Sequence, residues 1–175
     1  MRFEIYGGFE VPLEEHGVVL RGAQGRNSFW DEADRTKIGL RDACGCYVFA
    51  IRSGGGTTPW YVGKAEKSSF ERECFAPHKL NCYDYAITKY GAGTPLLYFV
   101  TMLTPSGRFS QPSKQGNAAI SFLERWLIGQ ALNKNPVLCN LKDTKFLKEL
   151  VVPGLLHSPP GKPKSAATEL RRILS

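Results

Sequence analysis

One glutamate stands among the apolar residues of a predicted helix. The run that follows Asn117 has apolar residues at helical spacing, namely Ile120, Leu123, Leu127 and Ala131. Glu124 falls within the stripe that they form. An ionised carboxylate on an apolar face is costly unless it is paired, hydrogen-bonded or metal-bound. Two interpretations stay open: Glu124 forms a salt bridge with a lysine or arginine of another element, or it binds Mg²⁺, which one carboxylate commonly holds together with waters and a substrate phosphate.

Two short apolar runs, each with one glycine and one tyrosine, precede this helix. Within them, residues 46–51 and 60–62 are rich in strand-forming residues, and a Gly-rich stretch over residues 53–58 joins the two runs. We predict an antiparallel hairpin with a loop longer than a tight turn. Tyr47 and Tyr61 are separated by an even number of positions, so an in-register hairpin places both on one face. Taken alone, each tyrosine would be a packing residue.

The order of residue types along the chain resembles a known family. The ordered set is Gly45-Cys46-Tyr47, then Tyr61-Val62-Gly63-Lys64-Ala65, then Arg72, His78, Glu124 and Asn140. Over about residues 43–142 it resembles the GIY-YIG endonuclease superfamily, and the second motif is similar to that of the nuclease domain of excision-repair incision proteins. The resemblance implies an α/β fold, with a three-stranded antiparallel sheet flanked by helices, and a divalent-metal-dependent endonuclease that hydrolyses DNA phosphodiester bonds with an activated water.

Such a reaction needs a base for the water and cations for the charge that develops on the phosphate. The resemblance implies that Glu124 holds Mg²⁺ or Mn²⁺ and that Arg72 contacts the scissile phosphate. Tyr47 would be the general base or orient the water, and Tyr61 would share its network. Lys64 is expected to lower a tyrosine pKa that is ordinarily about 10.

Other positions are less typical of the family. Cys46 replaces the usual aliphatic residue, which is a tolerable exchange of small apolar side chains. His78 lies farther from the preceding arginine than the family's histidine or tyrosine, so Tyr83 is an alternative for that position. We expect His78 to be a proton shuttle or a phosphate contact. Asn140 is expected to orient the site through hydrogen bonds, the alternative being a simple turn residue.

The elements that must position these residues follow from capping, turn and periodicity patterns. We predict a helix over 68–74 that Pro77 ends or distorts, a short helix over 84–89, a strand over 96–103 and a loop over 104–116. A terminal helix is expected over residues 166–174, after a Pro- and Gly-containing linker.

We divide the chain into three parts. Residues 1–42 form a small N-terminal extension of strand and turn, residues 43–143 form the nuclease-like core, and residues 144–175 form a basic C-terminal tail packed on or linked to the core. At 175 residues the chain has room for one hydrophobic core.

Composition favours a nucleic-acid partner. Lys and Arg outnumber Asp and Glu by 23 to 16, which gives a formal net charge of +7 and attracts polyanions. We expect DNA as the partner, with RNA left open, and a monomer or weak homodimer. No stretch is long and apolar enough to cross a bilayer. The five cysteines lack zinc-ligand spacing and a paired framework, so we expect a reducing, cytoplasmic location.

Two other function classes stay open. A catalytically inactive nucleic-acid-binding module could retain the fold, and a protein-interaction domain could carry the positive charge incidentally. Salt dependence separates these two, because phosphate binding weakens steeply with salt. The sequence does not choose between single-stranded, duplex and branched substrates.

Overall fold

The computed structural model describes residues 1–14, 17–19, 21–140, 144, 149, 151–155 and 161–174. The strands are β1 (Arg2–Glu10), β2 (Gly45–Ser53), β3 (Gly56–Ala65) and β4 (Thr94–Leu103). The helices are α1 (Ala23–Thr36), α2 (Phe70–Cys74), α3 (Pro77–Tyr90), α4 (Ala118–Lys134) and α6 (Ser165–Leu174). None of the helices in these ranges is long and apolar enough to span a membrane.

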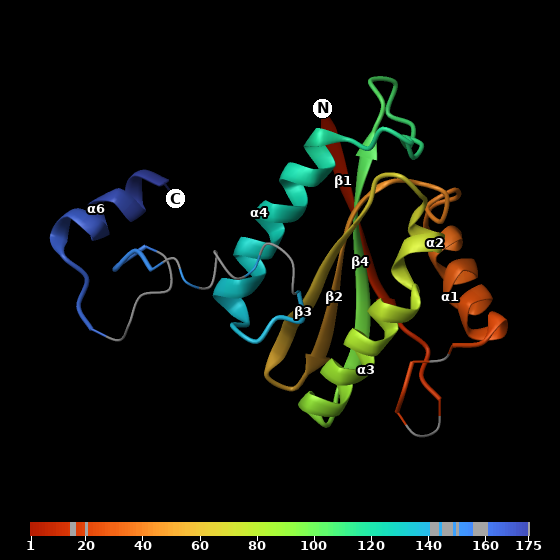
Figure 1. The fold of residues 1–175 in the computed structure, drawn as a ribbon, viewed down its shortest axis with the longest axis horizontal. Coiled ribbons are helices and arrows are strands. Elements are labelled where there is room, and N and C mark those ends of the chain that lie inside the picture. Colours follow the sequence, from red (N-terminus) through yellow and green to blue (C-terminus); the bar gives the residue numbers. More distant parts are fainter. Residues whose placement is uncertain are drawn as a thin grey trace.

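The sheet has four antiparallel strands in the order β1-β4-β2-β3, so the predicted three-stranded sheet is wrong (Figure 1). The additional strand is β1, which comes from the predicted N-terminal extension and pairs with β4 along its whole length. Without β1, the apolar strand β4 would present an unpaired edge, which proteins usually cover. The α/β class is confirmed.

The β2–β3 hairpin is tighter than predicted. The two strands pair as far as Ser53 and Gly56, which leaves only Gly54 and Gly55 in the turn. Thr57 and Thr58 belong to β3, because β-branched side chains favour strands. The positive φ angle at this hairpin belongs to Gly56, the first residue of β3, at 112°, a conformation that glycine adopts without steric strain.

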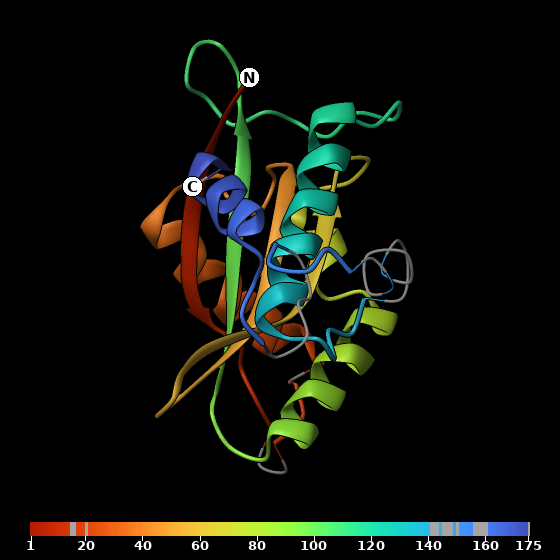
Figure 2. The ribbon, with the colours of Figure 1, turned by 90° about the vertical axis from the view of Figure 1, so that its left-hand side faces the viewer.

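The sheet lies between two helical layers. Alternate residues of β2 pack on opposite sides: Tyr47, Phe49 and Ile51 join the large core cluster with α1, α2 and α3, whereas Cys46 and Val48 pack toward α4. Figures 1 and 2 show α4 on one face of the sheet and α1, α2 and α3 on the opposite face. This alternation follows from the two-residue period of a strand.

Helix α1 is absent from the sequence prediction, which assigned strand and turn to this region. Its buried residues are Gly25, Phe29, Trp30 and Ala33, at the spacing of one helical face. Phe29 and Trp30 pack against Phe99 of β4, with ring centroids 6.4 and 5.6 Å away. The N-terminal segment therefore shares the main core. The boundary at residue 43 stays a prediction.

The other predicted elements differ mainly in length. Helix α2 ends at Cys74, and Pro77 occupies the first turn of α3, which is a favourable place for proline. Helix α3 therefore replaces the short helix predicted over 84–89, and it includes His78. The strand over 96–103, the helix after Asn117 and the terminal helix are confirmed as β4, α4 and α6. The Asn117 side chain accepts hydrogen bonds from the backbone N–H groups of Ala119 and Ile120.

Candidate active site

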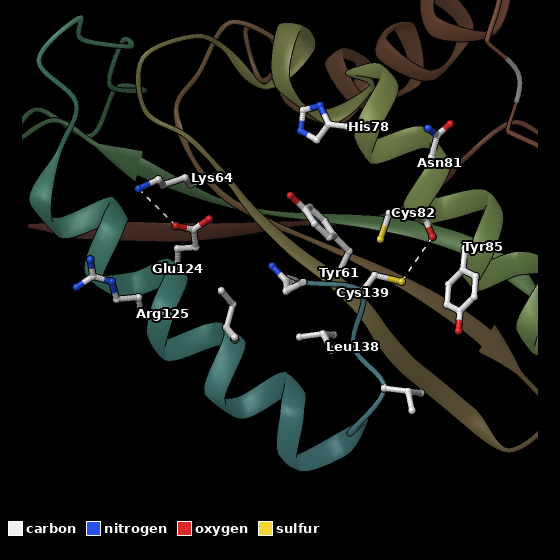
Figure 3. A pocket seen from close by; sticks show the side chains of 13 residues that line it. Tyr61, Lys64, His78, Asn81, Cys82, Tyr85, Glu124, Arg125, Leu138 and Cys139 are labelled. Atoms are coloured by element: carbon white, nitrogen blue, oxygen red, sulfur yellow. Dashed lines mark hydrogen bonds and ion pairs between the residues drawn. The ribbon is translucent and has the colours of Figure 1, made fainter. Parts of the chain in front are cut away.

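A cavity of about 820 Å³ opens beside β3, between α3 and α4 (Figure 3). Strand β3 contributes side chains from its edge position, α3 and α4 contribute from the two helical layers, and the chain after α4 completes the wall. The lining residues are Tyr61, Lys64, His78, Asn81, Cys82, Tyr85, Glu124, Arg125, Ile128, Val137, Leu138, Cys139 and Asn140.

Five of the seven predicted site residues line this cavity: Tyr61, Lys64, His78, Glu124 and Asn140. Apart from Tyr61 and Lys64, which share β3, they are far apart in the sequence, and the fold brings them together. Tyr47 and Arg72 are not part of the lining. Arg72 lies exposed on α2 and forms no ion pair with the described residues.

The two motif tyrosines share one face of the sheet, as predicted. Their ring centroids lie 6.1 Å apart. Tyr47 is fully buried behind Tyr61, and its hydroxyl is one of the buried polar atoms for which the described residues provide no hydrogen-bond partner. Burial raises the pKa of Tyr47 far above its ordinary value, and burial, with Cys82 and Glu124 nearby, also raises the pKa of Tyr61. Both side chains are therefore neutral phenols near pH 7.

Lys64 does not lower a tyrosine pKa, contrary to the prediction, because its ammonium group is directed to other partners. Lys64 Nζ lies 3.1 Å from Glu66 and 3.4 Å from Glu124, and it donates a hydrogen bond to Ser121 Oγ at 2.7 Å. Ser121 in turn donates to Glu66 at 2.9 Å. The lysine and the two glutamates thus form a network between β3 and α4, at one end of the cavity.

The charges in this network stabilise one another. Partial burial acts to lower the pKa of Lys64, but Glu66 and Glu124 outweigh it and raise that pKa. Partial burial acts to raise the pKa of Glu66, but hydrogen bonds from the Asn117 backbone, Ser121 and Lys64 outweigh it and lower that pKa. Lys64 is therefore a firmly held cation, and Glu66 a firmly held anion, at neutral pH.

The first interpretation of Glu124, a salt bridge with a basic residue of another element, is confirmed, since it pairs with Lys64 of β3. The second interpretation is also compatible with its position, because this carboxylate reaches the cavity and its oxygens are the ligands that Mg²⁺ prefers. Among the described residues, no group of three or more His, Cys, Asp or Glu side chains is placed to hold a metal. A bound ion would therefore need oxygens from water and from a substrate phosphate as well.

Asn140 holds the outer edge of β3. Its side-chain oxygen accepts from the Val62 backbone N–H at 2.9 Å, and its side-chain nitrogen donates to the Val62 carbonyl oxygen. The neighbouring residue Cys139 donates from its backbone N–H to the Trp60 carbonyl oxygen at 2.8 Å. These bonds fix the backbone on both sides of Tyr61, and the orienting role expected of Asn140 in the site stays a prediction.

His78 and Tyr83 lie on opposite sides of α3. His78 is exposed in the first turn of the helix and lines the cavity. Tyr83 is fully buried and stacks on Phe49, with ring centroids 4.0 Å apart. The geometry therefore favours His78 for the position that the sequence left open between the two.

Sequence reasoning gave no role to several residues that support the site. Glu66 and Ser121 complete the Lys64 network, and Glu66 lies just after the second motif. Lys79 is buried, pairs with Glu73, and its Nζ lies 5.3 Å from the centre of the Tyr47 ring. The helix carrying Lys79 was predicted to begin only at residue 84, so a buried lysine there had no predicted context.

In comparisons with protein-family models, with curated proteins and with solved structures, none matches this chain. The assignment of a function therefore depends on the residues, the geometry and the chemistry of the cavity.

Proposed function

We propose that the protein is a divalent-metal-dependent endonuclease that hydrolyses phosphodiester bonds of DNA. One observation carries the proposal: residues that a motif pattern selected from distant parts of the sequence line a single cavity, namely Tyr61, Lys64, His78, Glu124 and Asn140. The net charge of +7 supports a polyanionic substrate.

Lys64 supplies positive charge at the polar end of the cavity. As phosphodiester hydrolysis proceeds, negative charge builds up on the phosphate oxygens, and a preorganised cation stabilises it without further rearrangement. The carboxylates of Glu66 and Glu124 keep Lys64 protonated and in place. Arg125 and His78 add two exposed nitrogen-bearing side chains at the same cavity, where they can contact the phosphates on either side of the cut.

Tyr61 acts as a neutral phenol in this proposal. Because burial raises its pKa, the side chain keeps its proton near pH 7. A phenol can donate a hydrogen bond to a phosphate oxygen and accept one from the attacking water, so Tyr61 orients the reacting groups. Tyr47 lies behind it and packs against its ring, which makes Tyr47 a positioning residue.

Glu124 would hold the metal ion, with Mg²⁺ or Mn²⁺ as the candidates. A bound divalent ion supplies activation of water and neutralisation of phosphate charge. Glu124 offers its carboxylate from α4, where it lies 3.4 Å from Lys64 Nζ. A metal ion at this carboxylate would share it with Lys64 or take the place of the lysine.

A nucleic-acid-binding module without catalysis is the second candidate. The ion pair between Lys64 and Glu124 favours it, because a lysine can take the place of a metal ion beside a carboxylate. In such a module the cavity would still bind phosphates through its cations, and binding would weaken steeply as the salt concentration rises.

Cleavage of labelled single-stranded, duplex and forked DNA tests the proposal. The assay compares Mg²⁺, Mn²⁺ and chelator, for the wild type and Glu124→Gln. We expect cleavage only with metal and at least about a hundredfold slower cleavage by the variant, because metal activation contributes several kcal/mol to such reactions. Glu32→Gln is the matched control, since Glu32 is exposed on α1, outside the cavity lining.

The outcomes separate the two candidates. Metal-dependent fragments that disappear with Glu124→Gln but persist with Glu32→Gln support the nuclease. Salt-sensitive DNA binding without cleavage of any substrate supports the binding module instead. RNA substrates of the same sequences are included to show whether cleavage requires deoxyribose.

A further inference from the structure

The cavity continues beyond the residues that the proposed function uses. One end is polar and carries Lys64, His78 and Glu124. The side away from Lys64 and Glu124 carries Asn81, Cys82 and Tyr85, and the lining also includes the apolar residues Ile128, Val137 and Leu138. Figure 3 shows Lys64 and Glu124 on one side of the cavity and Tyr85 on the other. This Tyr85 end has no role in the hydrolysis of a phosphodiester.

Two side chains of the cavity lining are unusually accessible. Tyr85 is 54% exposed and Val137 is 56% exposed. They come from different elements, α3 and the chain after α4, and both belong to the cavity wall. Apolar surface gains about 25 cal/mol for each Å² that a ligand covers, so these side chains favour an apolar or aromatic group over a phosphate.

Helix α3 connects the two ends. His78, Cys82 and Tyr85 follow one another at spacings of four and three residues, so they lie on one face of the helix. Seven residues of helix rise about 10 Å, which separates the histidine from the tyrosine along the wall. A nucleotide whose phosphate lies near His78 and Glu124 can therefore reach toward Tyr85 with its base. The volume of about 820 Å³ is large enough for such a unit.

We propose that the Tyr85 end of the cavity binds an unpaired nucleobase of the DNA, which stacks on the Tyr85 ring beside the phosphate that is cleaved. This inference rests on the proposed function and specifies its substrate class: DNA with an unpaired nucleotide at the cut site. A base within an intact duplex is stacked and paired, and it must leave the helix before it can enter a pocket.

Binding in chelator tests the inference without cleavage. The probes are three DNA duplexes: one with a single bulged 2-aminopurine, one with an abasic bulge and one fully paired. We expect the wild type to bind the first most tightly and to change its 2-aminopurine fluorescence. Tyr85→Ala should weaken binding of that probe about five- to 150-fold, the range measured for base–aromatic stacking. Tyr85→Trp should restore binding, because it restores the stacking surface.

Trp126→Ala is the matched control. Trp126 is an aromatic residue of α4 with 53% exposure, and it is not among the cavity lining residues. Its removal should leave the order of the three probes unchanged. Tyr85→Ala is expected to fold normally because the side chain is half exposed, and thermal unfolding of the variant verifies this.

Cleavage of the same three duplexes in Mg²⁺ is measured in parallel. Preferential binding of the bulged base that depends on Tyr85 supports the inference, even if no duplex is cut and the nuclease proposal fails. Equal affinity for the three probes, or equal affinity of the wild type and Tyr85→Ala, overturns the inference, even if cleavage occurs. Absence of binding to all three probes overturns it as well.

Discussion

Gly63 provides a sharp test of how the motif strands pack. In the β2–β3 pair, Gly63 lies directly opposite Tyr47. A Cβ atom at position 63 would lie 2.3 Å from Tyr47 Cζ and 2.4 Å from its hydroxyl oxygen. Carbon atoms in contact prefer about 3.5 to 4.0 Å, so Gly63→Ala requires a shift of more than about 1 Å. Glycine is needed here because the tyrosine ring occupies the space of a side chain.

The Tyr47 ring has little room for that shift. It is fully buried, packs against Tyr61 and makes an edge contact with Phe70. Overpacking of a dense core costs about 1 to 3 kcal/mol, and we expect Gly63→Ala to reach about 3 kcal/mol. For a chain of this size, that loss lowers the Tm by roughly 6 to 12 °C. Urea denaturation and calorimetry measure the two quantities.

A double-mutant cycle identifies the cause. In a Tyr47→Leu background the ring is absent, so Gly63→Ala should cost less than about 1 kcal/mol. Gly54→Ala is the matched control, because no atom lies within 4 Å of the Cβ position of Gly54, and the change should stay within about 0.5 kcal/mol. If Gly63→Ala costs as much without the Tyr47 ring as with it, the steric explanation is refuted.

Three further predictions concern the polar residues around the cavity. Asn140→Ala should destabilise the protein by about 2 to 4 kcal/mol and speed hydrogen exchange of the Val62 amide, since two backbone hydrogen bonds lose their partner. Folding lowers the Glu66 pKa, so its stabilisation is complete above the unfolded-state pKa and is lost as the pH falls through the folded-state pKa. The stabilities of the wild type and Glu66→Gln, measured by denaturation, should therefore begin to converge only as the pH falls below about 4.3, the ordinary glutamate pKa. Glu73→Ala should lower the free energy of unfolding by about 3 kcal/mol, because it leaves the buried Lys79 ammonium group unpaired. Lys79→Met should lower it less, because the remaining carboxylate is partly exposed. Equal losses of stability in urea denaturation would contradict this.

Local patterns were sufficient to predict the central elements. The β2–β3 hairpin, β4 and the capped start of α4 carry clear alternation, apolar runs and a cap residue, and all three are confirmed. The shared face of Tyr47 and Tyr61 followed from an even separation along one hairpin. The place of Glu124 on an apolar stripe could be predicted as well, because a helix has a fixed period.

Long-range contacts account for what the sequence did not predict. Strand β1 pairs with β4, which lies more than eighty residues away, so no local pattern identifies it as a partner in the sheet. Helix α1 has a mostly polar composition, and only its packing beneath Phe99 explains why Phe29 and Trp30 form its buried face. Lys64 was expected to act on a nearby tyrosine, but it lies on the opposite face of β3 from Tyr61, where Ser121 and Glu124 of α4 are its partners.

The alternation of β3 explains how the cavity combines its two kinds of chemistry. Tyr61 projects toward the layer of α3, where burial keeps its proton in place, whereas Lys64 projects toward α4, where carboxylates keep it charged. These positions differ by an odd number of residues, so they belong to opposite faces of the strand. Both side chains reach one cavity because β3 is the edge of the sheet, where the two faces meet. A central strand would keep the phenol and the ammonium group in separate layers. The edge position of β3, fixed from outside by Asn140, is therefore the structural condition for the proposed chemistry.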